Sequence, residues 1–130
     1  DIATRLRIPQ VPVRPDPKRH GAGDQVEGVV HEGDVGMIIE DTISKGDGTI
    51  KSAEALRSKG VIVDTAYAIL TYELFYSRKR LEDAGIRLVT LTTLPKVIEV
   101  AEQYGYWPDQ KIELVKDWHK DPVAWAEKFS

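Results

Sequence analysis

Two adjacent carboxylates followed by a glycine-rich turn are the first feature of this sequence that could do chemistry. Glu40 and Asp41 end a short apolar run, and the turn SKGDG at residues 44–48 comes directly before a helix-like segment. In a turn that follows a parallel strand, the backbone N–H groups can bind phosphate, whereas carboxylates can bind hydroxyl groups or a metal ion. A sugar phosphate fits both halves, and an ordinary strand-to-helix turn explains the composition equally well.

Better-known loops fit this stretch poorly. It has no Gly-Lys-Ser/Thr sequence for a nucleoside triphosphate, and it lacks the third glycine of a dinucleotide fingerprint. A calcium loop starting at Asp41 would place Ile43 and Lys45 at ligand positions. His31 and His119 have no second ligand at metal spacing, so they are assigned no chemistry.

A second group of charged residues lies in the segment RPDPKRHGAGDQVEG at residues 14–28. Arg14, Lys18, Arg19 and His20 bring positive charge to a chain that two glycines make flexible, so this loop could fold over a polyanion. Taken alone, the loop is better explained as a solvated surface segment. Its pairing with the carboxylate and glycine motif favours the functional interpretation.

The strands and helices expected around these residues alternate along the chain. This order predicts an α/β fold with an open, mainly parallel sheet flanked by helices. Apolar runs at 36–39, 61–70 and 87–91 predict strands, of which the first is expected to be central and covered on both faces. A further short strand is predicted at 11–14. Helices are predicted at 50–59, 77–84, 97–104 and 110–119, with Gly60 ending the first of them and Asp121 capping a last helix that begins at Pro122.

Length and composition indicate one domain, 1–130, with a basic loop at 14–28 and C-terminal helices from about 95 to 130. The formal charge of −3 gives no reason to bind nucleic acid or an anionic membrane. The absence of cysteine excludes disulfides and thiol chemistry, and it favours a cytoplasmic location. An N-terminal segment upstream of Asp1 is expected to be missing. Aromatic residues near the C-terminus are expected to pack against the body: Trp118, Trp125 and Phe129.

The sequence resembles the bacterial-type branch of the orotate phosphoribosyltransferases, which belong to the type I phosphoribosyltransferases. Residues 14–28 match that family's flexible loop, Arg-x-x-x-Lys-x-His-Gly followed by Gln-Ile-Glu-Gly, with Val26 in place of isoleucine. The segment MIIEDTISKGDG resembles the family's motif for phosphoribosyl pyrophosphate. Residues 68–91 and 117–125 are also similar, so the resemblance covers nearly the whole chain.

This resemblance implies a Rossmann-like core and a Mg²⁺-dependent transfer of ribose 5-phosphate from phosphoribosyl pyrophosphate to orotate. The products would be orotidine 5′-monophosphate and pyrophosphate, in pyrimidine biosynthesis. It also implies a homodimer whose basic loop closes over the neighbouring subunit's site, with small-molecule substrates as the other partners.

The resemblance also implies residue roles. The ribose hydroxyls would be held by Glu40 and Asp41, the 5-phosphate by the turn from Thr42 to Gly48, and orotate partly by Ser44. Lys18 and His20 would be catalytic. Mg²⁺ would be held mainly by the substrate, near the two carboxylates, with no direct protein ligand assigned. The full set expected at phosphoribosyl pyrophosphate is Arg14, Lys18, His20, Glu40, Asp41, Thr42, Ile43, Ser44, Lys45, Gly46, Asp47 and Gly48.

Two positions depart from the family pattern within the phosphate turn. Asp47 brings a carboxylate beside the expected phosphate, which Lys45 could partly neutralise, and Gly48 removes a hydroxyl donor. Pro15 stands where many relatives carry a lysine. Two alternatives therefore stay open: a phosphoribosyltransferase for another nucleobase, and a non-catalytic protein that senses phosphoribosyl pyrophosphate.

Overall fold

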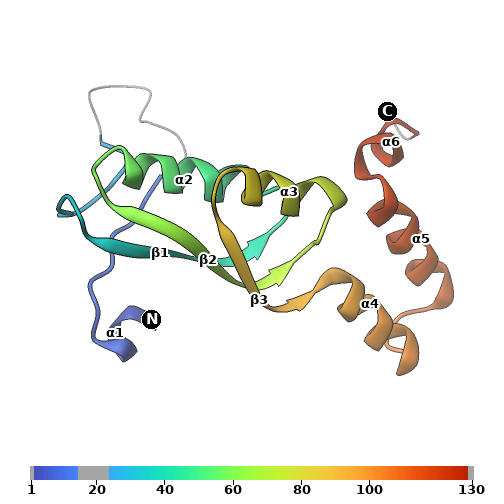
Figure 1. Ribbon diagram of the computed structural model, residues 1–130. Coiled ribbons are helices and arrows are strands. Elements are labelled where there is room, and N and C mark those ends of the chain that lie inside the picture. The colour runs from blue at the N-terminus through green and yellow to red at the C-terminus, as the bar shows by residue number, and fades with distance from the viewer. Residues whose placement is uncertain (1, 15–23, 129–130) are drawn as a thin grey trace.

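The computed structural model describes residues 2–14 and 24–128, and its centre is a three-stranded parallel sheet in the order β1-β2-β3 (Figure 1). The predicted α/β fold with helices around a parallel sheet is confirmed. The strands are β1 (Val35–Ile43), β2 (Ile62–Thr71) and β3 (Arg87–Thr93). The helices are α1 (Ile2–Leu6), α2 (Asp47–Arg57), α3 (Phe75–Asp83), α4 (Leu94–Gln103), α5 (Asp109–Lys120) and α6 (Pro122–Glu127).

Helices α2 and α3 lie on the same face of the sheet, and the main core fills the space beneath them (Figure 1). Ala53 of α2 and Ala66 of β2 are fully buried, and such small side chains let the helix backbone approach the strands closely. Leu81 of α3 is also fully buried in this cluster. The packing fixes the start of α2 against the end of β1.

The other face of β1 is open in the described part of the chain. Val35, Met37 and Ile39 are 81%, 50% and 45% exposed, and β1 pairs with β2 alone. The prediction of a central strand covered on both faces is therefore wrong for these residues. A continuous apolar run shows that both faces of a strand are apolar, but it does not show which neighbours cover them.

The strand predicted at 11–14 is also wrong, because only one antiparallel bridge forms there, between Val13 and Val26. The Arg14 N–H donates to the Gln25 carbonyl at 2.8 Å, and the Glu27 N–H donates to the Pro12 carbonyl at 2.8 Å. Proline has no N–H to extend such a ladder. The bridge nevertheless joins the two ends of the basic loop.

Two predicted helix ends are confirmed. Gly60 follows α2 with φ +81°, and the Val61 N–H donates to the Leu56 carbonyl at 3.2 Å. A glycine thus adopts the left-handed backbone conformation that commonly ends a helix. Asp121 caps α6, because its Oδ1 accepts from the N–H groups of Val123 and Ala124 at 3.1 and 3.0 Å.

Helices α4, α5 and α6 form an arm that extends from the end of β3 (Figure 1). Its own small core consists of Ile98, Ala101 and Ile112. The expected packing of Trp118 is confirmed, since its ring meets that of Tyr72 edge-on with centroids 5.7 Å apart. Phe129 lies outside the described residues. Among the described helices, none has the length and apolar character needed to cross a bilayer.

Candidate functional site

The turn between β1 and α2 presents an uncapped helix start at the carboxyl end of the sheet. Gly46 stands at the N-cap position with no side-chain cap, and the first helical hydrogen bond runs from the Ile50 N–H to the Gly46 carbonyl at 3.0 Å. No side chain therefore caps the N–H groups of the first turn, and they can bind an anion. The structure places the predicted residues Ser44, Lys45, Gly46, Asp47 and Gly48 in this turn and the first turn of α2.

Gly46 is the one residue of this turn whose conformation demands glycine. Its φ is +84°, and a Cβ built on it would lie 3.2 and 3.3 Å from two carbons of the buried Leu81 side chain. Gly48 has no such restriction, because nothing lies within 4 Å of the place its Cβ would take. Helix α3 therefore supports the shape of the turn through Leu81.

We expect Gly46→Ala to lower the free energy of unfolding by about 2 kcal/mol, from left-handed strain and the contact with Leu81. The matched variant Gly48→Ala should be neutral or stabilising by about 0.5 kcal/mol, because alanine favours the helix. Urea unfolding followed by circular dichroism measures both. Equal stability of the two variants would contradict the assigned role of Gly46.

The two carboxylates are carried by successive residues near the end of β1. Glu40 shares the helix-covered face with Ile38 and is partly buried, whereas Asp41 is exposed. Burial raises the pKa of Glu40, and the negative charge of Asp41 raises it further. The Thr42 N–H donates to Asp41 Oδ1 at 2.5 Å. Among the described residues, no group of three or more acidic or histidine side chains could hold a metal ion.

Glu40→Gln is expected to raise the melting temperature by about 2 °C at about pH 7.5. A raised pKa means that the folded protein holds the proton more tightly than the unfolded chain, so stability falls as pH rises from 4.5 through the raised pKa. The gain from glutamine should therefore vanish near pH 4, where Glu40 is protonated. Thermal melts at the two pH values, with the exposed Glu54→Gln as control, measure the effect. A gain that persists at low pH would rule out this electrostatic origin.

Asp47 forms an ion pair with Arg80 of α3, in place of the expected neighbour Lys45. Both side chains are about half exposed, so the pair contributes little stability. Its importance is electrostatic, because the guanidinium balances a negative charge at the start of α2. The carboxylate is thereby turned toward α3, which reduces its repulsion of an anion in the turn.

The base of the basic loop lies at the other end of α2. Arg14 forms an ion pair with Glu27, and Asp24 forms one with Lys59, just after the C-terminus of the helix. An 11-residue helix separates this anchor from the phosphate turn, a distance of roughly 16 Å. The structure therefore does not bring Arg14 and the turn together within one chain. Lys18 and His20 lie outside the described residues.

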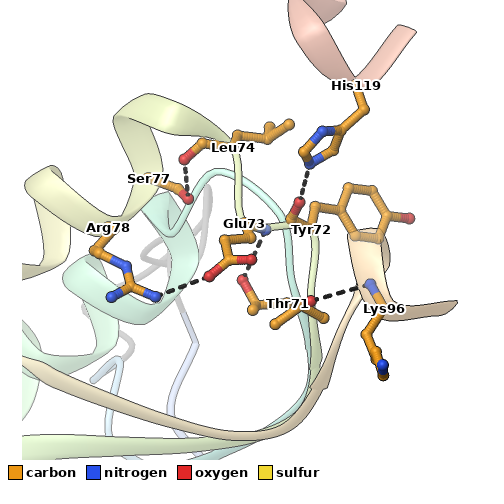
Figure 2. A network of polar contacts seen from close by, with 9 residues as sticks. Thr71, Tyr72, Glu73, Leu74, Ser77, Arg78, Lys96 and His119 are labelled. Atoms are coloured by element: carbon orange, nitrogen blue, oxygen red, sulfur yellow. Dashed lines mark hydrogen bonds and ion pairs between the residues drawn. The ribbon is translucent and has the colours of Figure 1, made fainter. Parts of the chain in front are cut away.

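A polar network at the end of β2 was missed by the sequence analysis (Figure 2). Glu73 has φ +52°, which is unusual for a residue with a side chain. Its N–H donates to Thr71 Oγ1 at 3.1 Å, and its carboxylate accepts from Arg78 Nη2 at 2.8 Å. The Tyr72 N–H donates to the Ile43 carbonyl at 2.9 Å, which joins this network to the end of β1. No local sequence signal marks Glu73 for this conformation, because glycine or asparagine is the usual choice.

A cleft of about 690 Å³ lies between α3 and the strands β2 and β3. Polar side chains including Asp64, Arg78 and Arg87 line it, and none of the predicted site residues does so. The candidate site is therefore the β1–α2 turn and the neighbouring end of β2, where Thr71 and Arg78 of the Glu73 network also line this cleft.

Comparison with known proteins gives consistent results for sequence and fold. No protein-family model matches the chain. It is 39% identical over 124 residues to orotate phosphoribosyltransferase of Lactococcus lactis, covering 95% of this chain and 59% of that protein. The orotate phosphoribosyltransferase of Listeria monocytogenes is 39% identical over 126 residues, which are 97% of this chain and 60% of the relative. The chain thus spans about three fifths of the curated relatives it matches.

Solved structures agree with this result. Orotate phosphoribosyltransferase from Aeropyrum pernix superposes with a TM-score of 0.64 at 31% identity, over 82% of this chain and 55% of that one. Adenine phosphoribosyltransferase from Thermoanaerobacter pseudethanolicus gives a TM-score of 0.58 at 26% identity, over 72% and 60%. The resemblance to orotate phosphoribosyltransferases is thereby confirmed over nearly the whole chain, and the fold is that of the phosphoribosyltransferases.

Proposed function

We propose that this chain is the core of an orotate phosphoribosyltransferase, which makes orotidine 5′-monophosphate and pyrophosphate from orotate and phosphoribosyl pyrophosphate in pyrimidine biosynthesis. The observation that carries the proposal is the first turn of α2 after Gly46, whose N–H groups have no side-chain cap, together with two carboxylates on the preceding strand β1. A sugar phosphate needs N–H donors for its phosphate and acceptors for its hydroxyl groups. Both are available at this edge of the sheet.

In this proposal the 5-phosphate binds the turn from Thr42 to Gly48, Glu40 and Asp41 accept from the ribose hydroxyls, and Ser44 also contacts orotate. The raised pKa of Glu40 fits a site role, because perturbed carboxyl groups gather where ligands bind. The pairing of Asp47 with Arg80 makes its carboxylate compatible with a bound phosphate.

The leaving pyrophosphate is assigned to Arg14, Lys18 and His20. Positive charge on its oxygens stabilises the negative charge that grows as the bond to ribose breaks. Mg²⁺ would be held mainly by the substrate, near Glu40 and Asp41, and would supply further positive charge at the pyrophosphate.

We also propose a cytoplasmic homodimer in which each basic loop serves the partner's site. The anchor of the loop at the C-terminal end of α2 supports this arrangement, because the phosphate turn of the same chain lies at the N-terminal end. A loop from a second subunit could reach that turn without crossing the length of the helix.

Two alternatives have specific support. The similarity to an adenine phosphoribosyltransferase supports another nucleobase as acceptor. Asp47 and Gly48, which depart from the family pattern, support a sensor that binds phosphoribosyl pyrophosphate without catalysis.

The decisive experiment measures pyrophosphate release from phosphoribosyl pyrophosphate and Mg²⁺ by the full-length protein, with orotate, uracil, cytosine, adenine or hypoxanthine offered separately. Release with orotate alone is expected. Release with adenine or another base alone would change the acceptor. No release with any base, from folded protein that binds phosphoribosyl pyrophosphate, would support the sensor.

A further inference from the structure

His119 of α5 reaches across to the end of β2 and contacts the main chain there (Figure 2). Its Nε2 lies 2.6 Å from the Tyr72 carbonyl oxygen, and a carbonyl can only accept, so Nε2 carries the proton and donates. The ring is partly buried. Trp118, its neighbour on α5, packs edge-on against the Tyr72 ring. The C-terminal arm therefore holds Tyr72 by both its carbonyl and its side chain.

The peptide group between Tyr72 and Glu73 is fixed at both of its polar atoms. Its carbonyl accepts from His119, and its N–H donates to Thr71 Oγ1 at 3.1 Å. Rotation of this peptide group would break both hydrogen bonds. Such bonds are needed because Glu73 has φ +52°, a strained conformation that persists only where the surroundings fix it.

This peptide group lies beside the phosphate turn. Thr71 and Ile43 are partners in the parallel register of β1 and β2, and the Tyr72 N–H donates to the Ile43 carbonyl at 2.9 Å. Ile43 is followed directly by Ser44, the first residue of the turn. A change in the orientation of the Tyr72–Glu73 peptide group would therefore alter the edge where the ligand binds.

We propose that His119 is a positioning residue: it locks the Tyr72–Glu73 peptide group in one orientation, so that the C-terminal helices set the shape of the substrate-binding edge. The proposal rests on the proposed function for the identity of the substrate. The lock itself follows from the contacts of His119, Tyr72, Glu73 and Thr71, and it can be measured without any substrate.

The test compares three variants of the full-length protein. His119→Phe keeps a ring but removes the donor, and His119→Gln restores an N–H near the position of Nε2. The control Lys116→Met removes the ion pair between α5 and Glu102 of α4, at 2.8 Å, without touching β2. Hydrogen exchange of the Glu73 amide should be about five-fold faster in His119→Phe, and close to wild type in the other two.

Kinetics give the second readout. If the wild-type protein releases pyrophosphate, His119→Phe should lower kcat/KM about ten-fold while His119→Gln recovers most of the loss. Thr71→Val removes the other bond of the same peptide group and should produce the same two changes, even if His119→Phe does not fold. Absence of wild-type turnover would reject the proposed function and leave the exchange test standing. Unchanged Glu73 exchange in both His119→Phe and Thr71→Val, or no recovery with glutamine, would overturn the positioning role.

Discussion

Under the proposed function, Lys18→Ala is expected to lower kcat for pyrophosphate release by about 100- to 1,000-fold, because the role proposed for Lys18 is to place a cation at the oxygens that gain charge in the transition state. The affinity for phosphoribosyl pyrophosphate should fall far less, by under about ten-fold, since the turn after β1 and its carboxylates still hold the sugar phosphate. Steady-state kinetics with orotate give kcat, and calorimetry without a nucleobase gives the affinity.

The neighbouring Arg19 offers a matched control, because it carries the same charge in the same loop but stands at an unspecified position of the motif Arg-x-x-x-Lys-x-His-Gly. Arg19→Ala should change kcat by less than about three-fold, as expected for a charge to which no contact with the substrate is assigned. Equal losses in the two variants would indicate a general charge effect of the loop. Full turnover in Lys18→Ala would remove this residue from the catalytic proposal.

The sequence predicted those parts of the fold that depend on local rules. The order of strands and helices follows from apolar periodicity, and Gly60 and Asp121 mark helix ends because backbone conformation and capping depend on neighbouring residues. The uncapped turn at Gly46 was likewise visible as a glycine between a strand and a helix. These features require no knowledge of distant contacts.

Contacts between distant parts of the chain could not be predicted in this way. Asp47 meets Arg80, 33 residues away, and His119 meets Tyr72, 47 residues away. Sequence spacing alone does not specify such pairs. The position of β1 at the edge of the sheet depends on which strand pairs with it, and the exposure of one of its faces depends on what packs over that face, so an apolar run was insufficient to establish either. The site expected along β1 and its turn therefore stays a prediction, and the contacts that α3 and α5 make with this region were not foreseen from the sequence.

Arg57 was given no role from the sequence, yet its guanidinium joins three elements. It lies at the last residue of α2, where Nε donates to the Val63 carbonyl at 3.0 Å, Nη1 to the Ala84 carbonyl at 2.7 Å and Nη2 to the Gly85 carbonyl at 3.1 Å. These acceptors belong to β2 and to the connection between α3 and β3. The Arg57 side chain thus joins the C-terminal end of α2 to β2 and to the connection between α3 and β3.

We expect Arg57→Met to lower the free energy of unfolding by about 3 kcal/mol, because methionine fills similar space but leaves these carbonyl groups without their donor. Arg57→Lys should recover less than half of that loss, since an ammonium group cannot match a planar fork that serves three acceptors. Urea unfolding measures both variants, with Arg87→Met at the exposed start of β3 as the control, which should change stability by less than about 0.5 kcal/mol. If Arg57→Met were as stable as Arg87→Met, the three carbonyls would be satisfied by water, and the helix layer would be held by the apolar core around Leu81 alone.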